Sequence, residues 1–173
     1  MFGKIKRHVT RRFYDSHPNL PLDPDVVQPG QYKWPPHFTP SLLPVVFLGG
    51  CIGAYARYWV SMEMPTAANG WPSATFTVNL LGAFLLGLLL EGLVRSGEDR
   101  GGRRLIRLAV GTGFMGAFTT YSSFASDVYN LTQHNHISIA VTYGLLTVAG
   151  GLALSAFGIW VASSHHKRRE RRA

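Results

Sequence analysis

The stretch that decides the fold is LLGAFLLGLLL, at residues 80–90. Its apolar side chains cover the whole circumference of a helix, whereas a helix in a soluble bundle keeps a polar stripe. The block around it, residues 71–94, exceeds the roughly 20 residues that a helix needs to cross about 30 Å of hydrocarbon. The stretch therefore predicts a membrane-spanning helix.

Three other blocks are comparably long and apolar, at residues 44–62, 105–131 and 137–163. Together the four blocks take up most of the chain after residue 40. The predicted fold class is therefore an all-α membrane protein with four transmembrane helices, in one domain at residues 41–163. Its flanks are a basic, proline-rich N-terminal extension at residues 1–40 and a basic tail at residues 164–173.

The N-terminal extension has seven prolines, which preclude a long helix there. No apolar run follows its first basic residues, so the pattern is not that of a cleavable signal. We expect a cytoplasmic extension. Its basic residues are either solvated or held against anionic lipid headgroups.

Lysine and arginine are distributed unevenly along the chain. Sixteen of the 17 lie in three polar segments, at residues 1–40, 95–107 and 167–172, and the other is Arg57. In a chain with four crossings these segments share one side, and the positive-inside rule makes that side the cytoplasm. We expect both termini to be cytoplasmic, in the cell's inner (plasma) membrane. This explains the net charge of +8 without invoking nucleic acid.

Catalytic signals are lacking. The lone cysteine, Cys51, excludes a disulfide within the chain and gives no thiolate metal site. The four blocks hold no nucleophile and base pair and no cluster of metal ligands, and His165 with His166 lies in the basic tail. We therefore do not expect an enzyme.

Glycines and hydroxyls interrupt the apolar blocks. Gly49 and Gly53 have the spacing of small-residue packing motifs in membranes. Residues 111–124, GTGFMGAFTTYSSF, place polar groups at membrane depth. One interpretation is a helix broken near its middle, whose freed carbonyls can coordinate a cation. The other is an unbroken helix whose hydroxyls bond to carbonyls four residues earlier.

Asn79 and Thr75 lie on one helical face, where lipid could not satisfy the amide donors, so they face protein or a pore. An anion path needs such donors without a strong cationic trap. Tyr121 and Phe124 either offer positive ring edges to an anion or pack in the core. Arg57 either attracts anions in a vestibule, or snorkels or bonds helix-end carbonyls.

Three segments carry a family resemblance: GGCIGAYARY at residues 49–58, TFTVNLLG at 75–82 and GFMGAFTTYSSF at 113–124. In sequence, order and spacing they resemble the Fluc (CrcB) fluoride channels, over residues 41–163. The resemblance implies passive fluoride export by an antiparallel dimer with two pores. It also implies a structural sodium ion at the dimer centre, held by the backbone carbonyls of Gly116 and Thr119.

The resemblance further assigns the residues that line the fluoride pathway. Carried over by position, these are Asn79, Thr75, Tyr121, Ser122, Phe124, Tyr143 and Thr147. The chain departs from the family at three places. The family usually has phenylalanine at Tyr121, glycine at Ala117 and often a hydroxyl at Gly151, so one of this chain's contributions to the pores is expected to be altered.

The partner is expected to be a second family subunit in the opposite orientation. A homodimer would require insertion both ways, which the one-sided lysine and arginine distribution disfavours. We therefore expect a heterodimer with a paralogue; the alternative is mixed insertion and a homodimer.

Other functions left open are a small multidrug-type exporter, although the first span lacks the buried glutamate of that class, and a membrane scaffold or assembly subunit.

Overall fold

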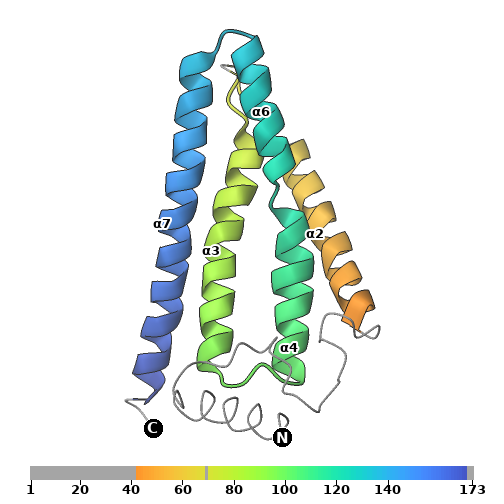
Figure 1. The fold of residues 1–173 in the computed structure, drawn as a ribbon, viewed down its shortest axis with the longest axis vertical. Coiled ribbons are helices and arrows are strands. Elements are labelled where there is room, and N and C mark those ends of the chain that lie inside the picture. Colours follow the sequence, from red (N-terminus) through yellow and green to blue (C-terminus); the bar gives the residue numbers. More distant parts are fainter. Residues whose placement is uncertain (1–41, 69, 171–173) are drawn as a thin grey trace, which may run out of the picture. The chain divides into compact units, whose positions relative to one another are not determined.

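The computed structural model describes residues 42–68 and 70–170, with side chains as far as Ser164. The predicted extension at residues 1–40 lies outside this part of the chain. Every regular element described is helical (Figure 1). In chain order the elements are α2 (Leu43–Glu63), α3 (Ser73–Arg95), α4 (Gly102–Ile106), the π-helix η3 (Arg107–Met115), α5 (Gly116–Phe118), α6 (Tyr121–Gln133) and α7 (Ile137–Glu170).

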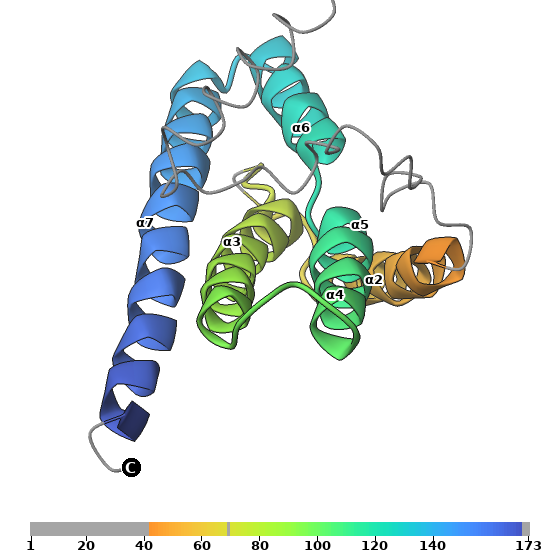
Figure 2. The same cartoon turned by 60° about the horizontal axis from the view of Figure 1, so that its bottom comes forward.

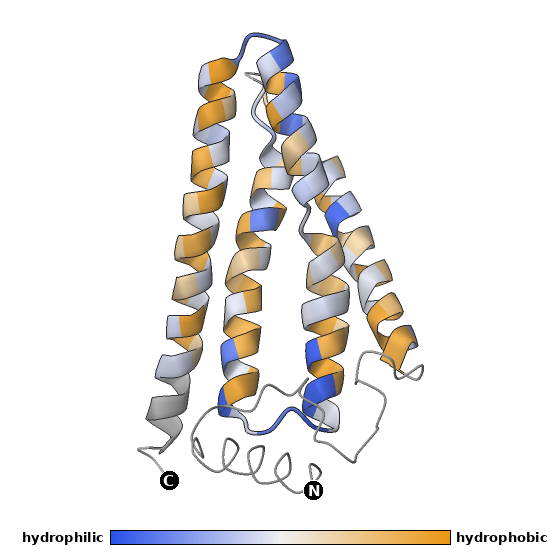
Figure 3. Ribbon diagram, viewed as in Figure 1, coloured by the Kyte–Doolittle hydropathy of each residue, from blue (hydrophilic) through white to orange (hydrophobic). Residues whose placement is uncertain are grey.

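Three helices are long and apolar enough to cross a membrane: α2, α3 and residues 137–164 of α7. In Figure 3 apolar residues dominate their lengths, and the most hydrophilic residues gather at the connections and helix ends. Large side chains such as Phe47, Trp59 and Leu152 are exposed on them. These features are those of a multi-pass, all-α membrane protein. Helix α7 continues through Glu170, beyond the predicted end of the span at Ser163.

The remaining apolar block forms two helical parts with an interruption between them. Helices α4, η3 and α5 follow one another without a gap and end at Phe118. Thr119 and Thr120 are extended, with φ −81°, ψ 158° and φ −149°, ψ 122°. Helix α6 then begins at Tyr121 and leads towards α7 (Figure 2). Of the two interpretations of residues 111–124, the broken helix is the correct one.

Helix α2 packs directly against η3 because glycines remove side chains from the contact. A Cβ at Gly49 would lie 3.2 Å from the backbone nitrogen of Phe114, and a Cβ at Gly53 would lie 3.0 Å from the Cα of Phe114. A Cβ at Gly113 would come within 3.1 Å of the Cα of Gly49. The predicted packing role of Gly49 and Gly53 is confirmed.

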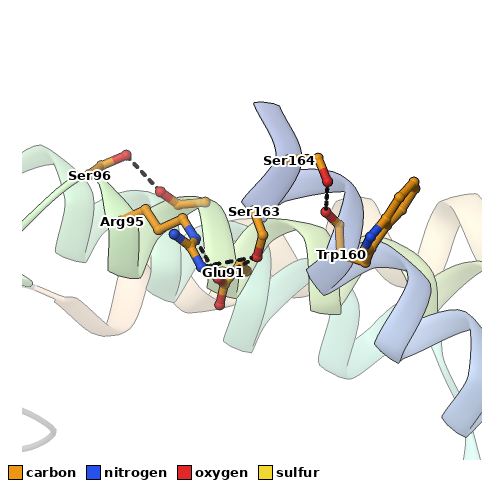
Figure 4. Close-up of polar contacts among 7 residues, drawn as sticks. Glu91, Arg95, Ser96, Trp160, Ser163 and Ser164 are labelled. Carbon is orange, nitrogen blue, oxygen red and sulfur yellow. Dashed lines mark hydrogen bonds and ion pairs between the residues drawn. The ribbon is translucent and has the colours of Figure 1, made fainter. Parts of the chain in front are cut away.

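Helices α3 and α7 form the other close pair. Gly87 on α3 faces the backbone of Ser155, and Gly158 on α7 faces the backbone of Phe84 and Leu88. Near the end of α3, the Oε1 atom of Glu91 accepts hydrogen bonds from Arg95 and from the hydroxyl of Ser163 (Figure 4). Glu91 therefore joins two helices, rather than being simply solvated at a span end.

Candidate functional site

Asn79 on α3 spans the interruption by pairing with the backbone of Thr120. Its Oδ1 accepts a hydrogen bond from the Thr120 N–H at 2.8 Å, and its Nδ2 donates to the Thr120 carbonyl at 3.0 Å. The two bonds fix the orientation of the amide and leave its second N–H available. The polar partner that sequence reasoning required for Asn79 is thus a peptide group 41 residues away.

Arg57 on α2 reaches the same interruption. Its Nε donates to the carbonyl of Ala117 at 3.0 Å. The guanidinium therefore bonds a helix-end carbonyl, and it also lines a cavity beside the break. Since only one of its N–H groups is used in this bond, the two roles considered for Arg57 are geometrically compatible.

The backbone at the interruption is only partly satisfied by hydrogen bonds. The carbonyl of Met115 accepts from both the N–H and the hydroxyl of Thr119, at 3.0 and 2.9 Å. The hydroxyl of Thr120 caps α6 by accepting from the N–H of Ser123 at 3.1 Å. The Thr120 N–H, which would donate to the Gly116 carbonyl in a continuous helix, is taken by Asn79. The carbonyl of Thr119, which lies outside the helices, accepts no hydrogen bond from the described residues. The break therefore makes these two oxygens available to an ion or water.

Two cavities lie beside the interruption, and Thr120 lines both. The first has a volume of about 270 Å³, and its polar lining includes Arg57, Ser61, Thr75, Thr120 and Ser123. The second has a volume of about 260 Å³ and is lined by Asn79, Thr119, Thr120, Tyr121, Phe124, Thr147 and Val148. Neither lining includes a carboxylate. Both linings combine hydrogen-bonding groups with apolar surface.

The second cavity gathers four of the seven predicted pathway residues: Asn79, Tyr121, Phe124 and Thr147. Thr75 lines the first cavity instead. The rings of Tyr121 and Phe124 are 6.1 Å apart and tilted by 40°. Tyr121 is 82% exposed in the single chain, so the second cavity is open on that side.

Tyr143 lies behind Phe124 rather than in either cavity lining. It is fully buried, with its ring centroid 5.3 Å from Phe124 and 5.5 Å from Trp71. Its hydroxyl donates to the Oδ2 atom of Asp127 at 3.3 Å. Tyr143 therefore connects the aromatic residues of the candidate path to the one carboxylate on α6.

Two other predicted hydroxyls have local partners. Thr147 is 9% exposed and donates to the carbonyl of Tyr143 at 2.7 Å, the usual backbone bond of a threonine within a helix. Ser122 is exposed, with its hydroxyl 3.2 Å from that of Thr120, and it lines neither cavity. The structure therefore does not bring Ser122 together with Asn79 and Phe124.

Thr120, Ser123 and Asp127 were not among the predicted site residues. A signal for Thr120 was present, because a threonine just before a helical segment is a favoured N-cap residue. Nothing in the sequence could place it between two cavities, since that position depends on α2 and α3. Asp127 accepts a hydrogen bond from the Tyr143 hydroxyl, a tertiary contact between α6 and α7 that the sequence did not indicate.

Comparison with known proteins finds a family and several relatives. Residues 44–159 match the family model described as CrcB-like protein, Camphor Resistance (CrcB). Fluoride-specific ion channel FluC 1 of Cutibacterium acnes is 42% identical over 67% of this chain and 81% of the relative. FluC 2 of Leifsonia xyli subsp. xyli is 40% identical, over 79% and 94%. FluC of Bordetella petrii is 37% identical, over 75% and 99%.

The matched range includes α2, the interruption and most of α7, and so contains every residue of both cavities. The chain therefore belongs to the CrcB family.

Proposed function

We propose that this chain conducts fluoride passively across the cell membrane and so exports it from the cytoplasm. The curated relatives at 37 to 42% identity are named fluoride-specific ion channels. The observation that carries the proposal is the chemistry of the two cavities beside the interruption. Amide, hydroxyl and guanidinium donors line them, and no carboxylate does.

Such a lining suits a small anion that is hard to dehydrate. Hydroxyls and the free N–H of Asn79 can replace water around fluoride one bond at a time. The edges of Phe124 and Tyr121 carry the positive part of the aromatic quadrupole and add weak attraction. Conduction requires binding that is favourable enough for entry and weak enough for exit, which dispersed neutral donors provide.

Arg57 supplies the attraction at the mouth of this path. Its guanidinium lines the first cavity, and it is the only formal charge in that lining. Because its Nε is held by the Ala117 carbonyl, the charge is fixed in place and partly offset by the carbonyl dipole. An anion is drawn in without being trapped.

A sodium ion at the carbonyls of Gly116 and Thr119 also belongs to the proposal. Gly116 loses the Thr120 N–H to Asn79, and the Thr119 carbonyl has no hydrogen-bond donor among the described residues, so both oxygens fit a hard cation that prefers oxygen ligands. No group of three histidine, cysteine, aspartate or glutamate side chains is placed to hold a metal in that part of the chain. The cation would supply a fixed positive charge and would bind the freed carbonyls.

The working unit that we propose is an antiparallel dimer with two pores. In each chain the remaining crossing, between α3 and α7, is made jointly by α4, η3, α5 and α6. The second cavity is open beside the exposed ring of Tyr121, so a single chain leaves the path unenclosed. A second subunit packed on this face would close it and bring two interruptions together.

The second subunit is proposed to be a paralogue. The one-sided lysine and arginine distribution places both termini of this chain in the cytoplasm and favours a single orientation in the plasma membrane. A paralogue with the opposite bias would insert the other way. It could also supply the pore elements that Tyr121, Ala117 and Gly151 alter in this chain.

Fluoride efflux from liposomes tests the function. Purified protein, alone and with the candidate paralogue, is reconstituted in vesicles loaded with potassium fluoride, and efflux is started with a potassium ionophore. Fluoride release that far exceeds chloride release is expected. Equal passage of chloride and fluoride, or no release from either preparation, would contradict the proposal.

A further inference from the structure

The interruption is not caused by proline. Sharp breaks in helices come from proline, from glycine and serine pairs, from π-bulges, or from a group inserted into the ladder of hydrogen bonds four residues apart. Residues 111–124 contain no proline, but their glycines and hydroxyls and the preceding π-helix η3 weaken the helix locally. The groups that approach from other helices decide which hydrogen bonds are lost.

Two side chains take the places of the missing helical bonds. In a continuous helix the Thr120 N–H would donate to Gly116, and the Tyr121 N–H would donate to Ala117. Here Asn79 Oδ1 accepts from the Thr120 N–H at 2.8 Å, and Arg57 Nε donates to the Ala117 carbonyl at 3.0 Å. The bond to Asn79 takes the Thr120 N–H away from the Gly116 carbonyl. The bond from Arg57 occupies the Ala117 carbonyl, which would otherwise accept from Tyr121.

The diverted bonds determine which oxygens stay free. Gly116 loses its usual donor, the Thr120 N–H, to Asn79, whereas the oxygen of Ala117 is occupied by Arg57. Thr119 lies in the extended segment, and its carbonyl accepts nothing from the described residues. Side chains on α2 and α3 therefore determine which carbonyls at the break are available.

We propose that Arg57 and Asn79 are positioning residues that hold the interruption open and so keep the carbonyls of Gly116 and Thr119 available to a monovalent cation. This inference rests on the sodium site of the proposed function. It gives both residues a task separate from any contact with fluoride. Losing either one allows the helix to close over the break and lowers sodium affinity.

Sodium-dependent thermal unfolding of the assembled channel in detergent tests this. The variants are Asn79→Ala, which removes both bonds to Thr120, and Arg57→Lys, which keeps the charge but loses the planar Nε–H. Ser163→Ala is the control, because it removes a polar contact between α3 and α7 at Glu91, away from the break. Sodium chloride is titrated against N-methylglucamine chloride.

We expect wild type and Ser163→Ala to share one half-saturating sodium concentration. Arg57→Lys should need about tenfold more, as one lost hydrogen bond implies, and Asn79→Ala should need at least about tenfold more, because it loses two. An unchanged sodium concentration in both variants would overturn the inference. So would a wild type that sodium does not stabilise. In that case intact fluoride efflux from the same preparation would show that the channel function stands while the sodium role fails.

A measurement on the wild type covers the case in which the variants do not assemble. Residue-resolved hydrogen exchange should show a protected Thr120 amide, bonded to Asn79, and a faster Tyr121 amide, because the N–H groups in the first turn of a helix lack an intrahelical partner. Protection of both amides to the same degree as those of α3 would indicate a closed helix and would refute the inference.

Discussion

Replacing Gly53 by alanine should weaken the packing of α2 on η3, and Gly50→Ala is a matched control three residues away. A Cβ at Gly53 would collide with the carbonyl oxygen of Phe114 and lie 3.0 Å from its Cα. A Cβ at Gly50 would meet only the carbonyl oxygen of Gly113, at 3.9 Å. Backbone atoms cannot rotate aside as a flexible side chain can, so only Gly53→Ala forces the helices apart.

The size of the effect follows from comparing the two variants. Both gain roughly 1 kcal/mol of helix propensity when glycine becomes alanine, and that gain cancels in the difference. Overpacking a close contact costs about 1 to 3 kcal/mol. The free energy of unfolding of Gly53→Ala should therefore be about 1 to 3 kcal/mol below that of Gly50→Ala.

The same displacement should also affect conduction. Arg57 lies one helical turn after Gly53, so a displacement of α2 would also lengthen its 3.0 Å bond to the Ala117 carbonyl. Denaturation with SDS in mixed micelles measures stability, and liposome efflux of fluoride measures function. Stabilities that agree within about 0.5 kcal/mol, together with equal efflux, would refute the reasoning.

Three further predictions concern the ion path and the partner. Asn79→Ala should lower fluoride efflux about tenfold or more, the equivalent of one lost hydrogen bond, and Phe124→Ile should also lower it, because the positive ring edge is lost. Normally assembled variants with wild-type efflux would contradict the path. Gly151→Ser should assemble normally, because an added Cβ lies 3.9 Å from that of Ala83, and its hydroxyl should raise efflux; unchanged efflux would place the position off the path. Reporters fused to the C-terminus should signal from the cytoplasm, since 16 of 17 lysines and arginines lie on one predicted side. Comparable signals from both sides of the membrane would contradict a single orientation. Robust fluoride efflux from this chain alone would contradict the need for a paralogue.

The spans were predictable because apolar length is a local property. The blocks at residues 44–62 and 71–94 correspond to α2 at Leu43–Glu63 and α3 at Ser73–Arg95. The end of α7 at Glu170 was not predictable, since a basic segment can continue a helix beyond the hydrocarbon core of the membrane. The π-helical form of η3 at Arg107–Met115 was also missed.

The site was predictable in its residue types and not in its contacts. The cost of burying an unpaired amide indicated that Asn79 faces protein or a pore, and it bonds to the Thr120 peptide. Local sequence limited the break to residues 111–124. Its position at Thr119 and Thr120 depends on Arg57 and Asn79, whose partners are 60 and 41 residues away in sequence.

The free carbonyls also bear on why a single chain should not persist in lipid. Within hydrocarbon, each unsatisfied backbone group costs several kcal/mol. The interruption takes the Thr120 N–H from the Gly116 carbonyl and leaves the Thr119 carbonyl without a donor among the described residues. Arg57 and Asn79 satisfy the neighbouring groups but cannot reach these as well, because the bonds that hold the break open occupy them. A second chain that covers the break around a cation would remove much of that cost, so the same opening that frees the carbonyls favours the assembly that uses them.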